Sequence, residues 1–389
     1  MLKGLLGKRR GKAIAVADIG GEGAGVAIIE APAKGPVRVL AAERATLPPE
    51  ERSSEANASG VIARLEEAAQ KALAAYARRT EKPSPHVSAA YAIVRAPWTR
   101  SVAARAEAEL PEGALVDDAA ISAAARQALA ADTKLDHAKI LDASVVRIEL
   151  NGYQTAKPEG KPARHIAVVA LLSECDPAIR AGISETLVKT FACPPPTLRS
   201  GARALLAVLR ENGLLREHCL IVETTSRATS LIAVRRGAVA EIAYVPEGTS
   251  SIVKRIAGDK MPEETLALIR MLSRGECETE SCQAIKEAIA RAEPELVKIF
   301  GDAMAGISAA RRLPDSLILL APADLSEWLV QFFSRIDFAP FTITTRPFSP
   351  GILSAQKDLA HSLSLESGVN PDPALSVACA LIPAEEQST

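Results

Sequence analysis

The order of predicted elements near the start of the chain recurs in its second half, and this repeat limits the possible folds more than any other feature. The earlier copy consists of expected strands at 13–19, 26–30 and 37–43. The later copy consists of expected strands at 219–223, 230–235 and 239–245. Short turns join the strands in both copies, and segments with helical spacing of apolar residues follow each copy. The chain is therefore predicted to contain two related βββαβα halves.

The remaining apolar patterns complete a mixed α/β chain. Further helices are expected at 57–79, 117–132, 176–191, 200–213, 249–257, 262–274, 281–311 and 325–334. Further strands are expected at 87–94, 139–150, 165–172 and 316–321. Asn151 and Gly152 form a strong turn signal between two of these strands. We predict residues 1–85 as the start of the first half, 86–194 as a small α/β insert within it, and 195–389 as the second half with a return to the first.

Composition excludes one class of partner. The 389 residues carry 46 basic and 47 acidic side chains, for a formal net charge of -1. A general nucleic-acid-binding protein needs a basic excess, and the aromatic share of 3% leaves few platforms for base stacking. No nucleic-acid partner is therefore expected.

A basic cluster without an acidic residue opens the chain. It consists of Lys3, Lys8, Arg9, Arg10 and Lys12. Each such charge contributes about 1 kcal/mol at an anionic membrane surface, so the cluster predicts peripheral membrane contact. A solvated leader before the first strand is the alternative. No apolar run approaches the length of a membrane span, and the leader is not typical of a secretory signal.

The six cysteines form no CxxC pair, so their spacing predicts no zinc site. They are Cys175, Cys193, Cys219, Cys277, Cys282 and Cys379. Cys277 and Cys282 are the two closest in sequence. Because five of the six have apolar or small neighbours, buried thiols in a reducing compartment are expected.

Four segments, in order, resemble the PilM/FtsA family of actin-like (ribonuclease-H-like) ATPases, and the type IV pilus assembly branch most closely. They are MLKGLLGKRRGKAIAVADIGG at the start, KILDASVVRIELNGYQTAKPEGKPA with Tyr153 and Pro158-Glu159-Gly160, LIVETTSRATSLIAVRRGAVAEIAYVPEGTSSIVKRIA, and NPDPALSVACALI. The resemblance covers nearly the whole chain. It implies an actin-like fold whose first half carries the insert.

The resemblance also implies a site for ATP and magnesium between the halves. In the family, two hairpin turns place acids and backbone N–H groups around the phosphates. The matching positions here are Asp18, Gly20 and Gly21 in the first turn, and Glu223, Thr225 and Thr229 in the second. Asp18 is the matching magnesium ligand.

All the matching nucleotide loops depart from the family pattern. Glu22 and Gly25 stand where the family has a small hydroxyl residue and a lysine. A carboxylate about 4 Å from a phosphate costs roughly 4 kcal/mol at an effective dielectric constant of about 20. In the second loop Thr225 replaces a glycine, and on the adenosine side Pro322 removes a backbone donor. The site is therefore expected to be degenerate and without ATPase activity.

No motif from another enzyme class replaces these loops. The sequence lacks the P-loop pattern GxxxxGK followed by Ser or Thr, and it lacks GxSxG and HExxH. The leading hypothesis is a cytoplasmic scaffold of a type IV pilus or related secretion machine, at the inner face of the cytoplasmic membrane. The resemblance implies that it binds the cytoplasmic tail of a PilN-like membrane protein in a groove beside the insert, by main-chain pairing.

Two alternatives share the fold. One is an FtsA-like division protein that self-associates into polymers at the membrane, and the other is an active ATPase. An FtsA-like protein is expected to end in an amphipathic helix, whereas this chain ends in the polar sequence LIPAEEQST, which favours the PilM branch.

Overall fold

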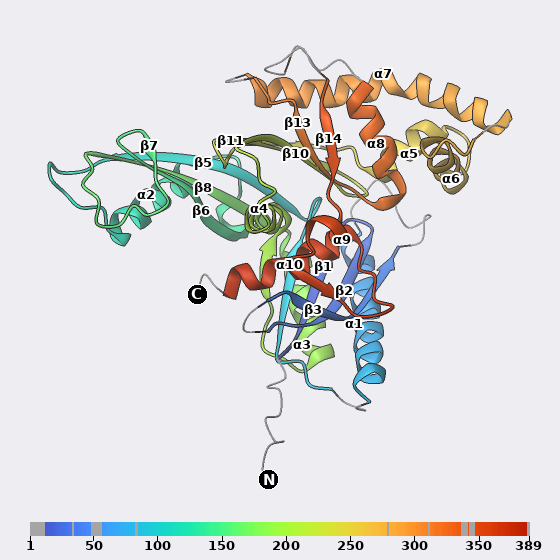
Figure 1. Ribbon diagram of the computed structural model, residues 1–389, viewed down its shortest axis with the longest axis horizontal. Helices are drawn as coiled ribbons and strands as arrows, with labels where there is room; N and C mark the ends of the chain where they lie inside the picture. Colours follow the sequence, from blue (N-terminus) through green and yellow to red (C-terminus); the bar gives the residue numbers. More distant parts are fainter. Residues whose placement is uncertain are drawn as a thin grey trace, which may run out of the picture.

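The structure is a computed structural model (Figure 1). It describes residues 12–32, 35–47, 57–81, 85–277, 280–309, 312–335, 341 and 347–386. Within the basic cluster, Lys3, Lys8, Arg9 and Arg10 lie outside the described residues, and Lys12 is exposed. Membrane contact through this cluster therefore stays a prediction.

The first half is built on a six-stranded sheet with the order β15-β3-β2-β1-β4-β9. Its strands are β1 (Ala13–Ile19), β2 (Gly23–Glu30), β3 (Val37–Thr46), β4 (Ala89–Val94), β9 (Thr197–Ser200) and β15 (Leu363–Leu365). Strands β1, β2 and β3 are antiparallel to one another, and β4, β9 and β15 add parallel pairs on either side of them. Every residue of β1 is buried, because helices cover both faces of the sheet.

Alternate residues of β1 enter two different cores. Ala15 and Ala17 face the helices α1 (Ala58–Thr80) and α3 (Pro177–Phe191). Ile14 and Val16 instead join a core with α4 (Gly201–Glu211) and α10 (Pro373–Glu386). The predicted apolar run at 13–19 is thus a strand buried on both sides.

The second half repeats the same strand pattern in a five-stranded sheet, with the order β12-β11-β10-β13-β14. Its strands are β10 (His218–Thr224), β11 (Thr229–Arg235), β12 (Ala238–Val245), β13 (Ser316–Leu320) and β14 (Ser349–Ile352). Its helices are α5 (Thr249–Ala257), α6 (Pro262–Ser273), α7 (Glu280–Ser308) and α8 (Ala323–Arg335), and the short α9 (Ala355–Asp358) follows β14. Three antiparallel strands followed by two parallel ones in both sheets confirm the predicted duplication.

The insert is a separate four-stranded sheet with the order β5-β8-β6-β7. Its elements are β5 (Thr99–Glu109), α2 (Asp118–Ala131), a short 3-10 turn (His137–Lys139), β6 (Ile140–Leu150), β7 (Tyr153–Gln154) and β8 (His165–Cys175). Helix α2 covers one face. In Figure 1 the insert projects to the left of both halves.

The boundaries of this sheet differ from the expected insert at 86–194. Strand β4 pairs with β1, and α3 packs on α1 in the core of the first half. The separate sheet therefore spans only Thr99–Cys175. Strands β5 and β9 were not among the expected elements.

The prediction of buried thiols is correct for four cysteines and wrong for two. Cys175, Cys193, Cys219 and Cys379 are buried and free. Cys277 and Cys282 form a disulfide, because the turn from α6 to α7 brings their Cα atoms to 5.6 Å. Among the described residues, no cluster of potential metal ligands is found, and no helix has the length and apolarity needed to cross a membrane.

Candidate functional site

A cleft lies where the first turns of the two halves approach each other. The turn after β1 and the turn after β10 line a cavity of about 300 Å³. Its polar and charged lining consists of Asp18, Glu22, Arg44, Thr46, Arg95, Glu223, Thr224, Thr225, Ser226, Asp324 and Asp372. The strand ends meet here because β1 and β10 occupy the same position in their respective sheets.

One row across the first sheet carries a carboxylate, a glycine and an arginine. Asp18 pairs with Gly25, and Gly25 pairs with Arg44 on the next strand. Arg44 Nη2 donates to Asp18 Oδ2 at 2.6 Å, and Arg44 Nε donates to Asp372 Oδ2 at 2.5 Å. A Cβ at Gly25 would lie only 2.8 Å from Arg44 Nη2. The missing side chain at Gly25 therefore makes room for a cation that comes from the neighbouring strand.

Arg95 joins the acids of the two turns. It follows β4 directly, and its side chain is 3% exposed. Its Nε donates to Asp18 Oδ1, its Nη1 donates to Glu223 Oε1, and its Nη2 donates to the carbonyl of Ala374 at 3.0 Å. The two carboxylates expected at the nucleotide site, Asp18 and Glu223, are thus bridged by a guanidinium group.

These pairings shift the pKa values of the cleft. Burial alone would raise the pKa of Asp18, but the positive charges of Arg95 and Arg44 outweigh burial and hold it below its usual value of 3.8. Burial opposes the charged form of Arg95, and attraction to Asp18 and Glu223 reverses that effect and raises the pKa of Arg95. Asp18 and Arg95 are therefore ionised at neutral pH.

The two turns also touch through a side chain. A Cβ at Gly21 would lie 2.8 Å from Arg227 Cδ and 2.8 Å from Pro97 Cδ. The Arg227 side chain, from the second turn, therefore covers the first turn at Gly21. On the other side Trp98 Nε1 donates to the carbonyl of Gly20 at 2.8 Å.

Two threonine hydroxyl groups at the second turn donate to backbone carbonyls. Thr225 Oγ1 donates to the carbonyl of Ala228 at 3.0 Å. Thr229 Oγ1 donates to the carbonyl of Glu247 at 2.7 Å, and Thr229 is fully buried outside the cavity. These two bonds fix the backbone around the second turn.

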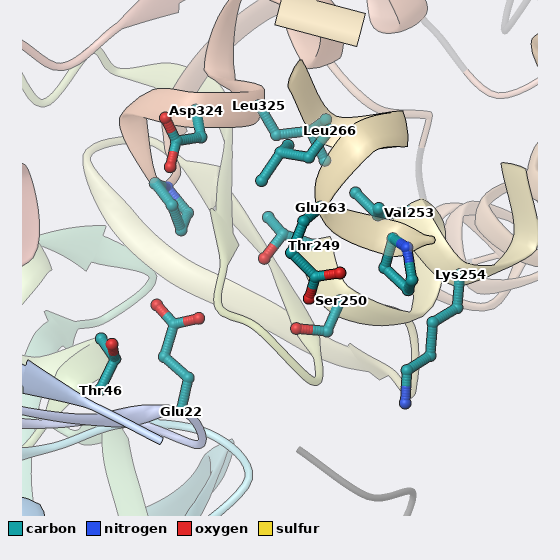
Figure 2. Close-up of a pocket in the computed structure, with 12 residues that line it drawn as sticks. Glu22, Thr46, Thr249, Ser250, Val253, Lys254, Glu263, Leu266, Asp324 and Leu325 are labelled. Carbon is teal, nitrogen blue, oxygen red and sulfur yellow. The ribbon is translucent and has the colours of Figure 1, made fainter. Parts of the chain in front are cut away.

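A second cavity of about 350 Å³ adjoins the first, and Glu22, Thr46, Pro322 and Asp324 line both (Figure 2). Glu22 and Thr46 reach it from the first half, and the other lining residues come from α5, α6 and the start of α8. Its apolar walls include Val253, Leu266 and Leu325. Pro322 also lines the cavity, as the sequence suggested.

The described residues of the cleft do not fit a magnesium triphosphate. Arg95 already pairs with Asp18, the expected magnesium ligand, and with Glu223, and the Arg227 side chain packs against Gly21 of the first turn. Five carboxylates face only two guanidinium groups in the lining of the first cavity, so the local charge repels an anion. Asp324, in the first turn of α8, further opposes anion binding at that helix N-terminus.

Five of the six residues expected at the site line this single cavity, and one does not. Asp18, Gly20, Gly21, Glu223 and Thr225 line it. Thr229 lies behind it. Sequence reasoning missed Arg44, Arg95 and Asp372, although two signals were present: Gly25 replaced an expected lysine, and Arg95 directly follows a predicted strand.

Comparison with known proteins identifies the fold but no sequence family. No protein-family model and no curated protein matches the sequence. Among solved structures, a PilM-PilN type IV pilus biogenesis complex contains a chain that matches with a TM-score of 0.59 and 15% identity, over 97% of this chain and 98% of that one. The ethanolamine utilization protein EutJ from Carboxydothermus hydrogenoformans matches at a TM-score of 0.40 and 12% identity, over 95% and 89% of the two chains. The architecture is therefore the predicted actin-like α/β fold.

Proposed function

We propose, starting from the fold that this chain shares with the PilM-PilN structure, that it is a nucleotide-independent scaffold of a type IV pilus or related secretion machine. The proposed location is the cytoplasm, at the inner face of the cytoplasmic membrane. The partner is the cytoplasmic tail of a PilN-like membrane protein. The observation that carries the partner assignment is the match to that complex over 97% of this chain.

The cleft supports independence from nucleotide. In this fold a nucleotide between the halves needs a cation beside the acids of the two turns. Arg95 supplies that positive charge from within the chain and also fills the space. A scaffold needs only the surfaces of the fold to bind other proteins, and it needs no bound nucleotide.

The insert offers a groove for an extended tail. A cavity of about 290 Å³ lies between β6 of the insert and the helices α4 and α10. Val145, Leu206 and Leu381 give it apolar walls, and Arg203 and Arg210 add positive charge. Val145 is 40% exposed although it is apolar. A peptide in this groove would cover it.

The test measures binding of a synthetic peptide by fluorescence anisotropy. The peptide has the sequence of the cytoplasmic tail of the PilN-like protein from the same genome. We expect the wild-type chain to bind and Val145→Asp to weaken binding at least about tenfold, since it places a charge against apolar contacts. Leu115→Asp is the matched control: Leu115 is 62% exposed on the same insert but outside the groove. Equal binding by both variants, or no binding by the wild-type chain, contradicts the proposal. Co-purification of division proteins instead favours the FtsA-like alternative.

Nucleotide binding is tested separately by calorimetry with ATP and magnesium. We expect no measurable binding at micromolar ligand, because the cleft is acidic and Arg95 already pairs with Asp18 and Glu223. Micromolar affinity would contradict this expectation and support the active-ATPase alternative.

A further inference from the structure

The contacts of Arg95 cross the boundary between the halves. Asp18 and the carbonyl of Ala374 belong to the first half, because β1 is a strand of the first sheet and α10 packs against β1, β2 and β3 of that sheet. Glu223 is the second-last residue of β10 in the second half. A single buried guanidinium group therefore binds both halves at the floor of the cleft.

Arg44 makes similar bonds that do not cross this boundary. Its partners Asp18 and Asp372 both lie in the first half, at the end of β1 and just before α10. Arg44 and Arg95 thus share one carboxylate, and only Arg95 reaches the second half within the described residues. Arg44 is therefore a matched control for Arg95 within the same cleft.

A second side-chain contact also crosses the boundary between the two halves. The side chain of Arg227, from the turn after β10, lies against Gly21 in the turn after β1. The two turns are in contact, so the halves are closed over the ion pairs. Both carboxylates are buried: Asp18 is 1% exposed and Glu223 is 4% exposed.

We infer that Arg95 is an internal substitute for a bridging cationic ligand, and that it holds the two halves closed by joining Asp18 to Glu223. The cavity left by truncating Arg95 is then a binding site for a small planar cation, since two carboxylates converge on it from opposite halves. This inference rests on the cleft geometry and not on the proposed pilus partner, so either can fail without the other.

The experiment compares Arg95→Ala with Arg44→Ala in the full chain. Both changes remove one guanidinium group that is bonded to Asp18. For Arg95→Ala we expect a larger radius of gyration by small-angle scattering and faster amide exchange in the turns after β1 and β10. We also expect a melting temperature lower by about 5 °C or more, because a buried ion pair is broken. For Arg44→Ala we expect a lower melting temperature without opening.

Chemical rescue distinguishes the loss of the Arg95 bridge between the two halves from a general loss of stability. Guanidinium chloride at low millimolar concentration should bind the Arg95→Ala cavity, raise its melting temperature and restore the compact scattering profile. Urea is the matched probe, because it has the same planar shape without the charge. Rescue of Arg95→Ala by guanidinium and not by urea supports the inference. No rescue of a folded Arg95→Ala, or equal opening of both variants, overturns it.

A milder variant decides the question if Arg95→Ala does not fold. Glu223→Gln keeps the side-chain shape and can still accept a hydrogen bond from Arg95, but it removes the charge on the second half. We expect faster amide exchange in both turns with the insert unchanged. Exchange identical to the wild-type chain in both turns would show that the bridge does not hold the halves together.

Discussion

Two guanidinium groups share the carboxylate of Asp18, so its ionised state is linked to folding. The usual pKa of this side chain is 3.8, and Arg95 and Arg44 lower it in the folded chain despite burial. The folded chain therefore binds fewer protons than the unfolded chain near and below that pH. The stabilisation is fully present above about pH 4 and is lost as the pH falls through the folded-state pKa.

Replacing Asp18 with Asn tests this linkage. We expect Asp18→Asn to lower the free energy of unfolding at neutral pH by about 3 kcal/mol, because two buried arginines lose their shared counter-charge. The gap between variant and wild-type chain should narrow as the pH falls below about 4, because the carboxylate is protonated first in the unfolded chain and at still lower pH in the folded chain. Urea unfolding followed by circular dichroism across this range measures it. Asp118→Asn, at an exposed position, is the control. A gap that stays constant with pH contradicts the linkage.

The free cysteines give a second prediction about individual residues. Burial raises the pKa of Cys175 to about 12 and that of Cys219 to about 11, and it also raises the pKa of Cys193 and Cys379. Since the thiolate is the reactive form, we expect almost no labelling by a thiol reagent in the native chain at neutral pH.

Counting thiols after denaturation completes this test. Four should react in denaturant without a reductant and six with one, because Cys277 and Cys282 form a disulfide. Mass spectrometry of the labelled chain gives both counts. Rapid native labelling of the free cysteines would contradict their burial, and six labels without a reductant would contradict the disulfide.

Among the elements, those with strong apolar patterns were predictable and those defined by pairing were not. The run at 13–19 is β1 to the residue. Strand β5, with the sequence TRSVAARAEAE, has few large apolar residues, and it is a strand because β8 pairs with it along its whole length. Strand β9 has only four residues and follows three prolines. Their burial comes from partners far away in the sequence, which local pattern does not contain.

The same distinction applies to the candidate site. Asp18 and Glu223 could be found because each lies at or near the end of an apolar strand. Their cationic partners could not be assigned, since Arg44 and Arg95 lie 26 and 77 positions from Asp18 in the sequence. Sheet register and strand order bring these side chains together. Resemblance to a family also directs attention to the family's ligands and away from a replacement within the chain.

The junction of the insert with the first half depends on a short chain of hydrogen bonds. Asp142 on β6 accepts a bond from the backbone N–H of Ser200 at 2.9 Å, and Ser200 is the N-cap of α4. Ser173 on β8 donates to the Ser200 hydroxyl at 2.9 Å. Asp142 is buried, so these bonds are made without competition from water. They position α4 relative to the insert.

Removing this carboxylate should loosen the start of α4. We expect Asp142→Ala to lower the free energy of unfolding by about 2 kcal/mol, since a buried N–H loses a charged acceptor. Amide exchange should rise in the first turn of α4. Asp117→Ala is the matched control: Asp117 caps α2 in the same insert, so exchange should rise in α2 instead. An unchanged α4 in Asp142→Ala would show that the junction does not depend on this bond.

At the level of the whole molecule, α4 and α10 belong to a core shared by the two sheets. That core contains Ile14 and Val16 of β1 together with Cys219 and Ile221 of β10. Helix α4 lies near the centre of Figure 1, where the insert and both halves meet. The far faces of the sheets have cores of their own, with α1 and α3 in the first half and α5 to α8 in the second. A defect in the shared core should therefore destabilise both halves at once.

Three leucine-to-alanine variants test this coupling. Leu209 on α4, Leu65 on α1 and Leu329 on α8 are all fully buried, so each substitution should cost about 3 to 5 kcal/mol. Amide exchange by mass spectrometry should rise in both β1 and β10 for Leu209→Ala, because the helix supports one face of each sheet. Leu65→Ala should affect mainly the first half, and Leu329→Ala mainly the second. If Leu209→Ala raised exchange in one half only, the two sheets would be independent folding units. The buried ion pairs of Arg95 would then be the principal link between the two halves. In that case Arg95→Ala should open the two halves more than Leu209→Ala does.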